Sequence, residues 1–196
     1  MGSNRLEAFS DGVLAIIITI MVLELEVPEG HEWSDLWDAT GLGLLTYLLS
    51  FVYIGIYWNN HHHLFQICDE VDGGVLWANL LLLFSLSLYP FTTAWMDESE
   101  LAQVPVVAYG INLLAAGASF YVLEHMMARL PGQRDKLREA FGRTTKEQLS
   151  LLLYTLGILL ALFTEPWVGL VPYVLVALMW VVPDRRVERY LARQAE

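Results

Sequence analysis

The sequence has little positive charge and almost no cysteine. Among its 196 residues there are 11 Lys and Arg against 22 Asp and Glu, which gives a formal net charge of -11 at pH 7. With this excess of acid we expect no nucleic-acid partner. The single cysteine, Cys68, allows no internal disulfide, so the fold does not depend on an oxidising compartment.

The residue patterns typical of enzymes are also missing. We find no Ser-His-Asp constellation, no glycine-rich phosphate loop and no paired carboxylates within the apolar runs. The chain is therefore expected to be no enzyme and to need no cofactor. Three consecutive histidines, His61, His62 and His63, do suggest a metal site. Neighbouring residues on a helix point about 100° apart, however, so all three cannot reach one ion from one helix.

Apolar residues are abundant and dominate the composition. They make up 56% of the chain, the mean hydropathy is +0.46, and seven Trp accompany nine Tyr. This composition predicts an all-α integral membrane protein rather than a soluble domain. Six apolar runs predict one six-helix domain over 1–196, with spans at 6–26, 40–60, 74–95, 104–127, 147–164 and 167–182. The first run has one Arg before it and no small-residue cleavage site after it, which predicts a retained helix rather than a signal peptide.

The basic residues all fall on one side of this predicted topology. They are Arg5, the loop residues Arg129, Arg134, Lys136, Arg138, Arg143 and Lys146, and the tail residues Arg185, Arg186, Arg189 and Arg193. The three opposite loops carry no Lys or Arg. The positive-inside rule therefore predicts that both termini are cytoplasmic. Thr144 and Glu147 have the spacing of a capping box for the fifth span. Within the spans, Pro90 predicts a bend in the third, and Glu124 near the end of the fourth is expected to pair with Arg129 or His125.

The first span combines an apolar stripe with a polar opening turn. On a helical wheel Ile16, Thr19, Ile20 and Leu23 fall within an arc of about 100°, with Gly12 one turn below. This apolar stripe could line a pathway, or it could simply pack or face lipid. Ser10 and Asp11 lie off the stripe, and polar groups at a membrane boundary need partners. The available candidates at matching depth are Trp58, His61 and Asn79.

Two carboxylates, Glu24 and Glu26, follow the stripe at its outer end. The three loops on this side contain acids and no bases, so they could raise the local cation concentration around an entrance. The alternative is that these acids only solvate the loops. Both interpretations stay open at this point.

The opening turn resembles a known family motif. Arg5, Phe9, Ser10 and Asp11 match the R-x-x-x-F-S-D motif that opens the first helix of the transmembrane protein 175 (TMEM175) family, which comprises the lysosomal potassium channel and its prokaryotic relatives. Trp58 and His61 at the end of the second span, and Asn79 in the third, continue the match. The resemblance covers spans one to three.

The resemblance implies a fold and a function. It implies a homotetramer of six-span subunits, with the first helix lining the pore and its narrowest ring at Ile16, Thr19 one turn outward and Leu23 beyond. It also implies that Arg5, Phe9, Ser10, Asp11, Trp58, His61 and Asn79 form a structural clasp. Apart from the resemblance, proton sensing through His61 or Asp11 is a sharper alternative, because histidine can change its charge near neutral pH. The implied location is the prokaryotic plasma membrane.

These observations predict a cation channel. One stripe cannot enclose a pathway, so several first helices must face a shared axis. No T-V-G-Y-G filter is present, so a hydrophobic constriction would give modest preference for potassium over sodium, with other monovalent cations or protons as further candidates. Membrane lipid is the other expected partner, and no metal is expected beyond permeating potassium. The alternative function is a carrier or a metal-binding membrane enzyme that uses the cluster from His61 to His63.

Overall fold

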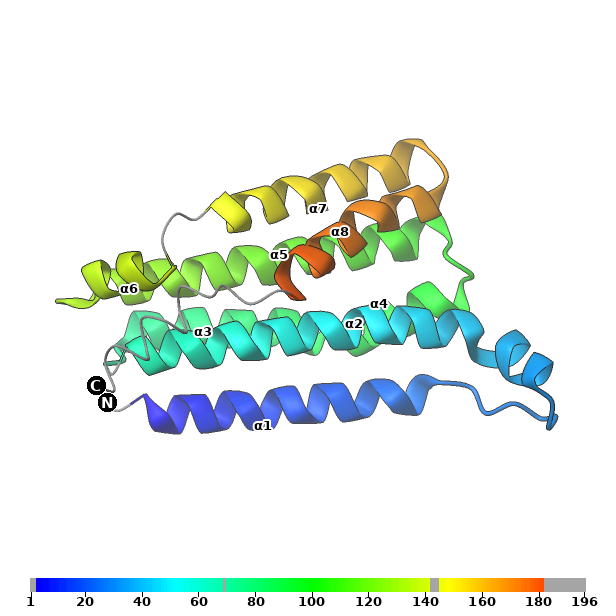
Figure 1. Cartoon of the computed structure of the whole chain (residues 1–196), viewed down its shortest axis with the longest axis horizontal. Coiled ribbons are helices and arrows are strands. Elements are labelled where there is room, and N and C mark those ends of the chain that lie inside the picture. The colour runs from blue at the N-terminus through cyan, green and yellow to red at the C-terminus, as the bar shows by residue number, and fades with distance from the viewer. Residues whose placement is uncertain (1–2, 69, 142–144, 182–196) are drawn as a thin grey trace.

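A computed structural model describes residues 3–68, 70–141 and 145–181, which fold into helices joined by loops. The elements are α1 (Asn4–Met21), η1 (Val22–Glu24), α2 (Trp33–Ile67), α3 (Gly73–Ser87), α4 (Tyr89–Glu98), α5 (Gln103–Ala128), α6 (Gln133–Phe141), α7 (Thr145–Phe163), η2 (Pro166–Gly169) and α8 (Leu170–Val181). The long helices run side by side, and α1 lies along one edge of the bundle (Figure 1). The all-helical prediction agrees with this architecture.

Five helical segments of the described chain are long and apolar enough to cross a membrane. They are Asn4–Glu24, Trp33–Ile67, Gly73–Glu98, Gln103–Ala128 and Thr145–Phe163. The sixth predicted span, 167–182, corresponds to the shorter apolar segment Pro166–Val181. This segment begins as the 3-10 turn η2 behind Pro166, and the described chain ends at its other end.

Two predicted spans have different bounds in the structure. The helix α2 has 35 residues, well beyond the predicted 40–60, because Glu32 and Asp35 form a capping box at its start and the helix continues to Ile67. At 1.5 Å per residue it is about 50 Å long and exceeds a hydrocarbon core of about 30 Å. The predicted span 74–95 is interrupted at Leu88, two residues before Pro90, where the bend was expected. The chain then continues as α4 to Glu98.

Tight contacts between helices depend on small residues. The side chain of Tyr173 on α8 lies against Gly110 of α5 and Gly157 of α7, where a Cβ atom would collide with the ring. These glycines let α5, α7 and α8 approach closely, as is common between membrane helices. Tyr173 also accepts at its backbone oxygen a hydrogen bond from the buried Tyr53 hydroxyl of α2, at 2.6 Å.

Some sequence predictions fall on residues that the structure does not describe. Thr144, the proposed N-cap of the fifth span, lies outside the described residues, and the described part of α7 begins at Thr145. Arg143 and the four tail arginines also lie outside them. The side that carries the predicted basic loop is therefore represented by α6 and the residues that flank it.

Candidate functional site

The first helix has one buried face and one exposed face. Leu14, Ile17 and Met21 are almost fully buried against the rest of the subunit. The apolar stripe lies on the opposite face, where Ile16 is 58% exposed and Ile20 is 42% exposed. This division follows from helical periodicity, since residues three and four apart share a face.

Leu23 continues the apolar stripe by a different backbone. The α-helix ends at Met21, and Leu23 belongs to the 3-10 turn η1, so the wheel used for the sequence does not describe its direction. It is nevertheless 78% exposed. Gly12 and Thr19 are exposed as well, so every residue of the predicted stripe faces away from its own subunit.

The Thr19 hydroxyl is held by its own helix. Its oxygen lies 3.0 Å from the carbonyl oxygen of Ala15 and 2.9 Å from that of Ile16, and the hydroxyl donates its proton to these acceptors. This geometry leaves the oxygen lone pairs on the exposed side. A donated proton turned inward and lone pairs turned outward suit an oxygen that faces a cation.

On the buried side of α1, N-terminal to Ile16, three buried polar side chains connect three helices. Asn79 of α3 donates through Nδ2 to the Ser10 hydroxyl of α1 at 3.0 Å, and its Oδ1 lies 2.8 Å from Nε2 of His61 on α2. Ser10 in turn donates to the carbonyl of Leu6 at 2.9 Å. Since Oδ1 can only accept, Nε2 of His61 carries the proton in this network. We call Ser10, His61 and Asn79 the buried trio.

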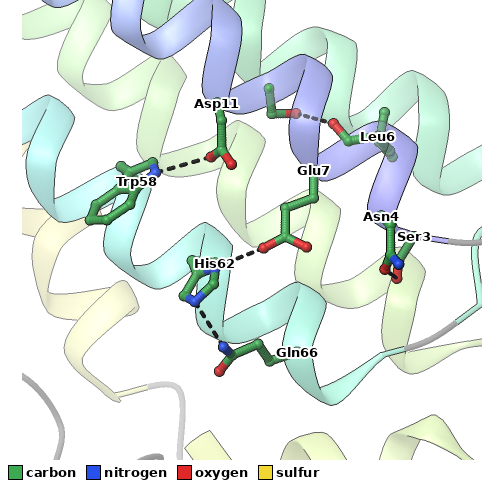
Figure 2. A network of polar contacts seen from close by, with 9 residues as sticks. Ser3, Asn4, Leu6, Glu7, Asp11, Trp58, His62 and Gln66 are labelled. Carbon is green, nitrogen blue, oxygen red and sulfur yellow. Dashed lines mark hydrogen bonds and ion pairs between the residues drawn. The ribbon is translucent and has the colours of Figure 1, made fainter.

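A second set of contacts joins α1 to α2 on the more exposed side (Figure 2). Trp58 donates from Nε1 to Asp11 at 3.0 Å, and Nδ1 of His62 lies 2.7 Å from the carboxylate of Glu7. Gln66 donates to the other nitrogen of His62 at 2.8 Å, which leaves Nδ1 as the donor to Glu7. We call these five residues the lateral pairs.

The lateral pairs include two residues that the sequence analysis missed. Glu7 lies one helical turn before Asp11, and Gln66 lies one turn after His62. The contacting residues are therefore four apart on both helices, with Glu7 and Asp11 on α1 and Trp58, His62 and Gln66 on α2. This spacing was the signal available in the sequence.

Arg5 and Phe9 do not join these networks. Both are exposed, with Phe9 53% exposed, and they lie on the same face as Gly12 and Ile16. The structure thus brings Ser10 and Asp11 together with Trp58, His61 and Asn79, and places the other two residues of the motif at the N-terminal end of the exposed face.

Beyond the C-terminal end of α1, carboxylates gather around a surface pocket. Glu24 and Glu26 line it together with acids from the α2 start and the α4 end, namely Asp38, Asp97, Glu98 and Glu100. The sequence analysis identified the first two and assigned the others only to acidic loops. The tertiary structure brings two of the three acidic loops, between α1 and α2 and between α4 and α5, to one rim.

The structure also bears on metal and on buried carboxylates. Within the described residues, no group of three or more His, Cys, Asp and Glu side chains could hold a metal ion.

Glu124 does not pair with Arg129 or His125 as predicted. Its carboxyl is instead within hydrogen-bonding reach of the carboxyl of Glu147 on α7, so the prediction that no carboxylates pair within the spans is wrong.

Comparisons with known proteins found relatives of this chain. A model of the family described as the endosomal/lysosomal potassium channel TMEM175 matches residues 5–90. A protein named as a potassium channel from Chryseobacterium sp. (strain P1-3) is 51% identical over 191 residues, covering 97% of this chain and 98% of that protein. The protein from Gallus gallus named as the endosomal/lysosomal proton channel TMEM175 is 32% identical over 120 residues, covering 59% of this chain and 23% of that protein.

A solved structure is similar over nearly the whole chain. It is the crystal structure of a lysosomal potassium-selective channel TMEM175 homologue from Chamaesiphon minutus, with a TM-score of 0.77 and 30% sequence identity. The match covers 91% of this chain and 96% of that one.

Proposed function

The chain belongs to the TMEM175 family, and on that premise we propose that it is a potassium channel of the prokaryotic plasma membrane whose pathway is lined by α1. The single observation that carries the proposal is the exposed apolar stripe. A residue such as Ile16, 58% exposed, lies in the middle of a helix that is firmly packed on its other face. In this family, the simplest partner for such a face is the same face of further subunits.

The proposed assembly is a homotetramer of six-span subunits with both termini in the cytoplasm. The position of α1 at the edge of the bundle leaves its stripe free to meet other copies (Figure 1). One stripe cannot enclose a pathway, so a closed ring of copies around an axis is required. The family resemblance supplies the number four. The shorter apolar segment Pro166–Val181 would then be the sixth span of the single domain over 1–196.

The proposed constriction is hydrophobic. Four copies of Ile16 would form the narrowest ring, and Ile20 and Leu23 would extend the apolar wall outward. An ion that passes this ring must lose part of its hydration shell, and potassium loses water at lower cost than sodium. The Thr19 oxygens, with their lone pairs on the exposed side, would replace part of that shell. This mechanism gives modest selectivity over sodium without a cage of carbonyls.

The buried trio and the lateral pairs are proposed to fix the rotation of α1. Ser10 is fully buried and bonded to α3, so turning α1 about its axis would break a buried hydrogen bond. Asp11 and Glu7 add contacts to α2 at a second azimuth. Holding the helix at two azimuths keeps Ile16 and Thr19 directed at the axis.

The acidic rim is proposed as the outer vestibule of the channel. Glu24 and Glu26 line the rim directly beyond the apolar stripe, with further carboxylates from α2 and α4 around them. Negative charge at a pore mouth raises the local concentration of cations and repels anions. The vestibule would therefore supply potassium to the constriction.

Flux through proteoliposomes tests the proposal. The purified protein is reconstituted with a potassium gradient, and the reversal potential is measured under potassium and sodium. We expect Ile16→Ala to raise the flux and to lower the preference for potassium, because a wider ring demands less dehydration. The matched control is Leu152→Ala on α7, which removes an apolar side chain of similar exposure, 64%, from a different helix.

The opposite outcome would place the pathway elsewhere. An unchanged reversal potential in Ile16→Ala, or an equal change in Leu152→Ala, contradicts a constriction on α1. Saturable flux that depends on His62 and His63, or a metal that copurifies in stoichiometric amount, would favour the carrier or metal-binding alternative.

A further inference from the structure

The exposed face of α1 extends further towards the N-terminus than the apolar stripe. Arg5, Phe9, Gly12, Ile16 and Thr19 follow one another at intervals of four, three, four and three residues, and all five are exposed. At 100° per residue they fall within an arc of about 80°. The side chains of Arg5 and Phe9 therefore point in the same direction as that of Ile16.

Arg5 carries the one charge on this line of α1. The two carboxylates of the same helix, Glu7 and Asp11, are turned away from the line and towards α2 (Figure 2). Glu7 contacts Nδ1 of His62 at 2.7 Å, and Asp11 accepts a hydrogen bond from Trp58 at 3.0 Å. The positive charge of α1 thus lies on its exposed face, and its negative charges lie on the side that packs against the subunit.

The other end of the same face has the opposite charge. Beyond Leu23, Glu24 and Glu26 line the acidic rim together with carboxylates from α2 and α4. Residues 24–42 and 97–104, which supply this rim, contain no Lys or Arg. Arg5 and Glu24 are separated by about 28 Å at 1.5 Å per residue, which is close to the thickness of a hydrocarbon core. One exposed face therefore has a basic end and an acidic end on opposite sides of the membrane.

On the basis of the proposed assembly, in which α1 lines the pathway, we propose that Arg5 forms a positive ring at the inner mouth and makes the channel rectify inwardly. A guanidinium is always charged, so four copies of it lower the cation concentration at that mouth. The acidic rim raises the cation concentration at the outer mouth. Potassium that flows inward starts from the enriched mouth, and potassium that flows outward starts from the depleted one. At equal driving force the inward current is therefore the larger. This assigns Arg5 to the pathway rather than to the structural clasp.

Patch-clamp recording tests the proposal, because an excised inside-out patch fixes which side of the protein meets each solution. Currents are measured with the same potassium concentration on both sides, at voltages of equal size and opposite sign. At about 0.1 M salt we expect an inward current roughly twice the outward current, and at about 1 M a ratio near one, since the Debye length falls to about 3 Å. Arg5→Gln should lower the ratio by raising the outward current. Arg5→Lys keeps the charge and should keep the wild-type ratio.

Two further variants separate a ring in the pathway from a distant surface charge. Arg134→Gln removes the same charge from an exposed residue of α6, at the same end of the molecule (Figure 1), and should leave the ratio unchanged. Arg5→Cys can be labelled from the inner side with methanethiosulfonate reagents, since the native Cys68 is buried. A trimethylammonium reagent should restore the wild-type ratio, and a sulfonate reagent should raise the outward current further.

Equal ratios in the wild type and in Arg5→Gln, or an equal change in Arg134→Gln, would overturn the proposal. Ile16→Ala distinguishes this failure from a failure of the proposed function. If Ile16→Ala shifts the reversal potential between potassium and sodium while Arg5→Gln leaves the ratio unchanged, α1 lines the pathway and Arg5 forms no ring in it. If neither variant has an effect, the pathway does not follow α1, and the proposed function fails as well.

Discussion

Removal of the Asn79 side chain tests how α1 is held in the subunit. Asn79 is fully buried, and its amide is the only link in the buried trio that joins Ser10 of α1 to His61 of α2. In Asn79→Ala both of these contacts are lost. We expect a loss of stability and a freer rotation of the first helix.

The size of the effect follows from what each partner retains. Ser10 keeps its bond to the Leu6 carbonyl and loses one bond that it accepts, which costs about 0.5–1.5 kcal/mol. His61 loses the partner of Nε2, and its Nδ1 is already buried without a partner, so the ring is left with no hydrogen bond. An orphaned buried donor costs about 1–3 kcal/mol. Hydrogen bonds between membrane helices contribute about 0.6 kcal/mol on average, so we expect a loss at the low end of the summed range, about 2 kcal/mol in the free energy of unfolding.

The assay is reversible unfolding in mixed micelles, with the helix content followed against denaturing detergent. The comparison variant is Trp58→Phe, which removes one exposed hydrogen bond to Asp11 and should cost about 0.5–1 kcal/mol. Ser10→Ala combined with Asn79→Ala completes a double-mutant cycle, and the two losses should not add. If Trp58→Phe costs as much as Asn79→Ala, or if the cycle is additive, the buried trio is not the contact that holds α1.

Three further changes have defined outcomes. Thr19→Val keeps the shape and removes the hydroxyl, so we expect a smaller potassium current in proteoliposomes, and a full-size current would contradict the coordinating role. Glu24→Gln with Glu26→Gln should lower the flux roughly twofold at about 0.01 M salt and have little effect at about 1 M, since salt screens the vestibule charge. Gly157→Ala drives a methyl group into a tyrosine ring of α8 and should destabilise the protein by about 1–3 kcal/mol in a thermal melt, whereas Gly55→Ala, which meets no atom within 4 Å, should not.

Much of the first helix could be predicted because its information is local. The exposure of Ile16 and Ile20 follows from the three-to-four-residue period, and the need of Ser10 and Asp11 for partners follows from the cost of burying polar groups. The partners could also be predicted from their depth. Ser10 and Asn79 lie near the starts of their helices and Trp58 lies near the end of its helix, and these ends meet at one end of the bundle. Depth follows from counting residues along a helix.

The azimuth at which helices meet could not be predicted in the same way. The sequence does not show that Arg5 and Phe9 lie on the exposed face while Glu7 meets His62, because that depends on how α1 is rotated against α2. The carboxyl pair of Glu124 and Glu147 was missed for the same reason, since each residue looks isolated in its own span.

The sequence by itself determined that this is an all-helical membrane protein of the TMEM175 type, through its hydropathy and its R-x-x-x-F-S-D motif. Only the tertiary structure decided the length of α2, the bounds of the short apolar segment Pro166–Val181 and the sides on which α1, α5 and α7 meet their neighbours. Composition and period are properties of one segment at a time. The rotation and close approach of packed helices depend on side chains and glycines from several segments at once, such as Tyr173 against Gly110 and Gly157.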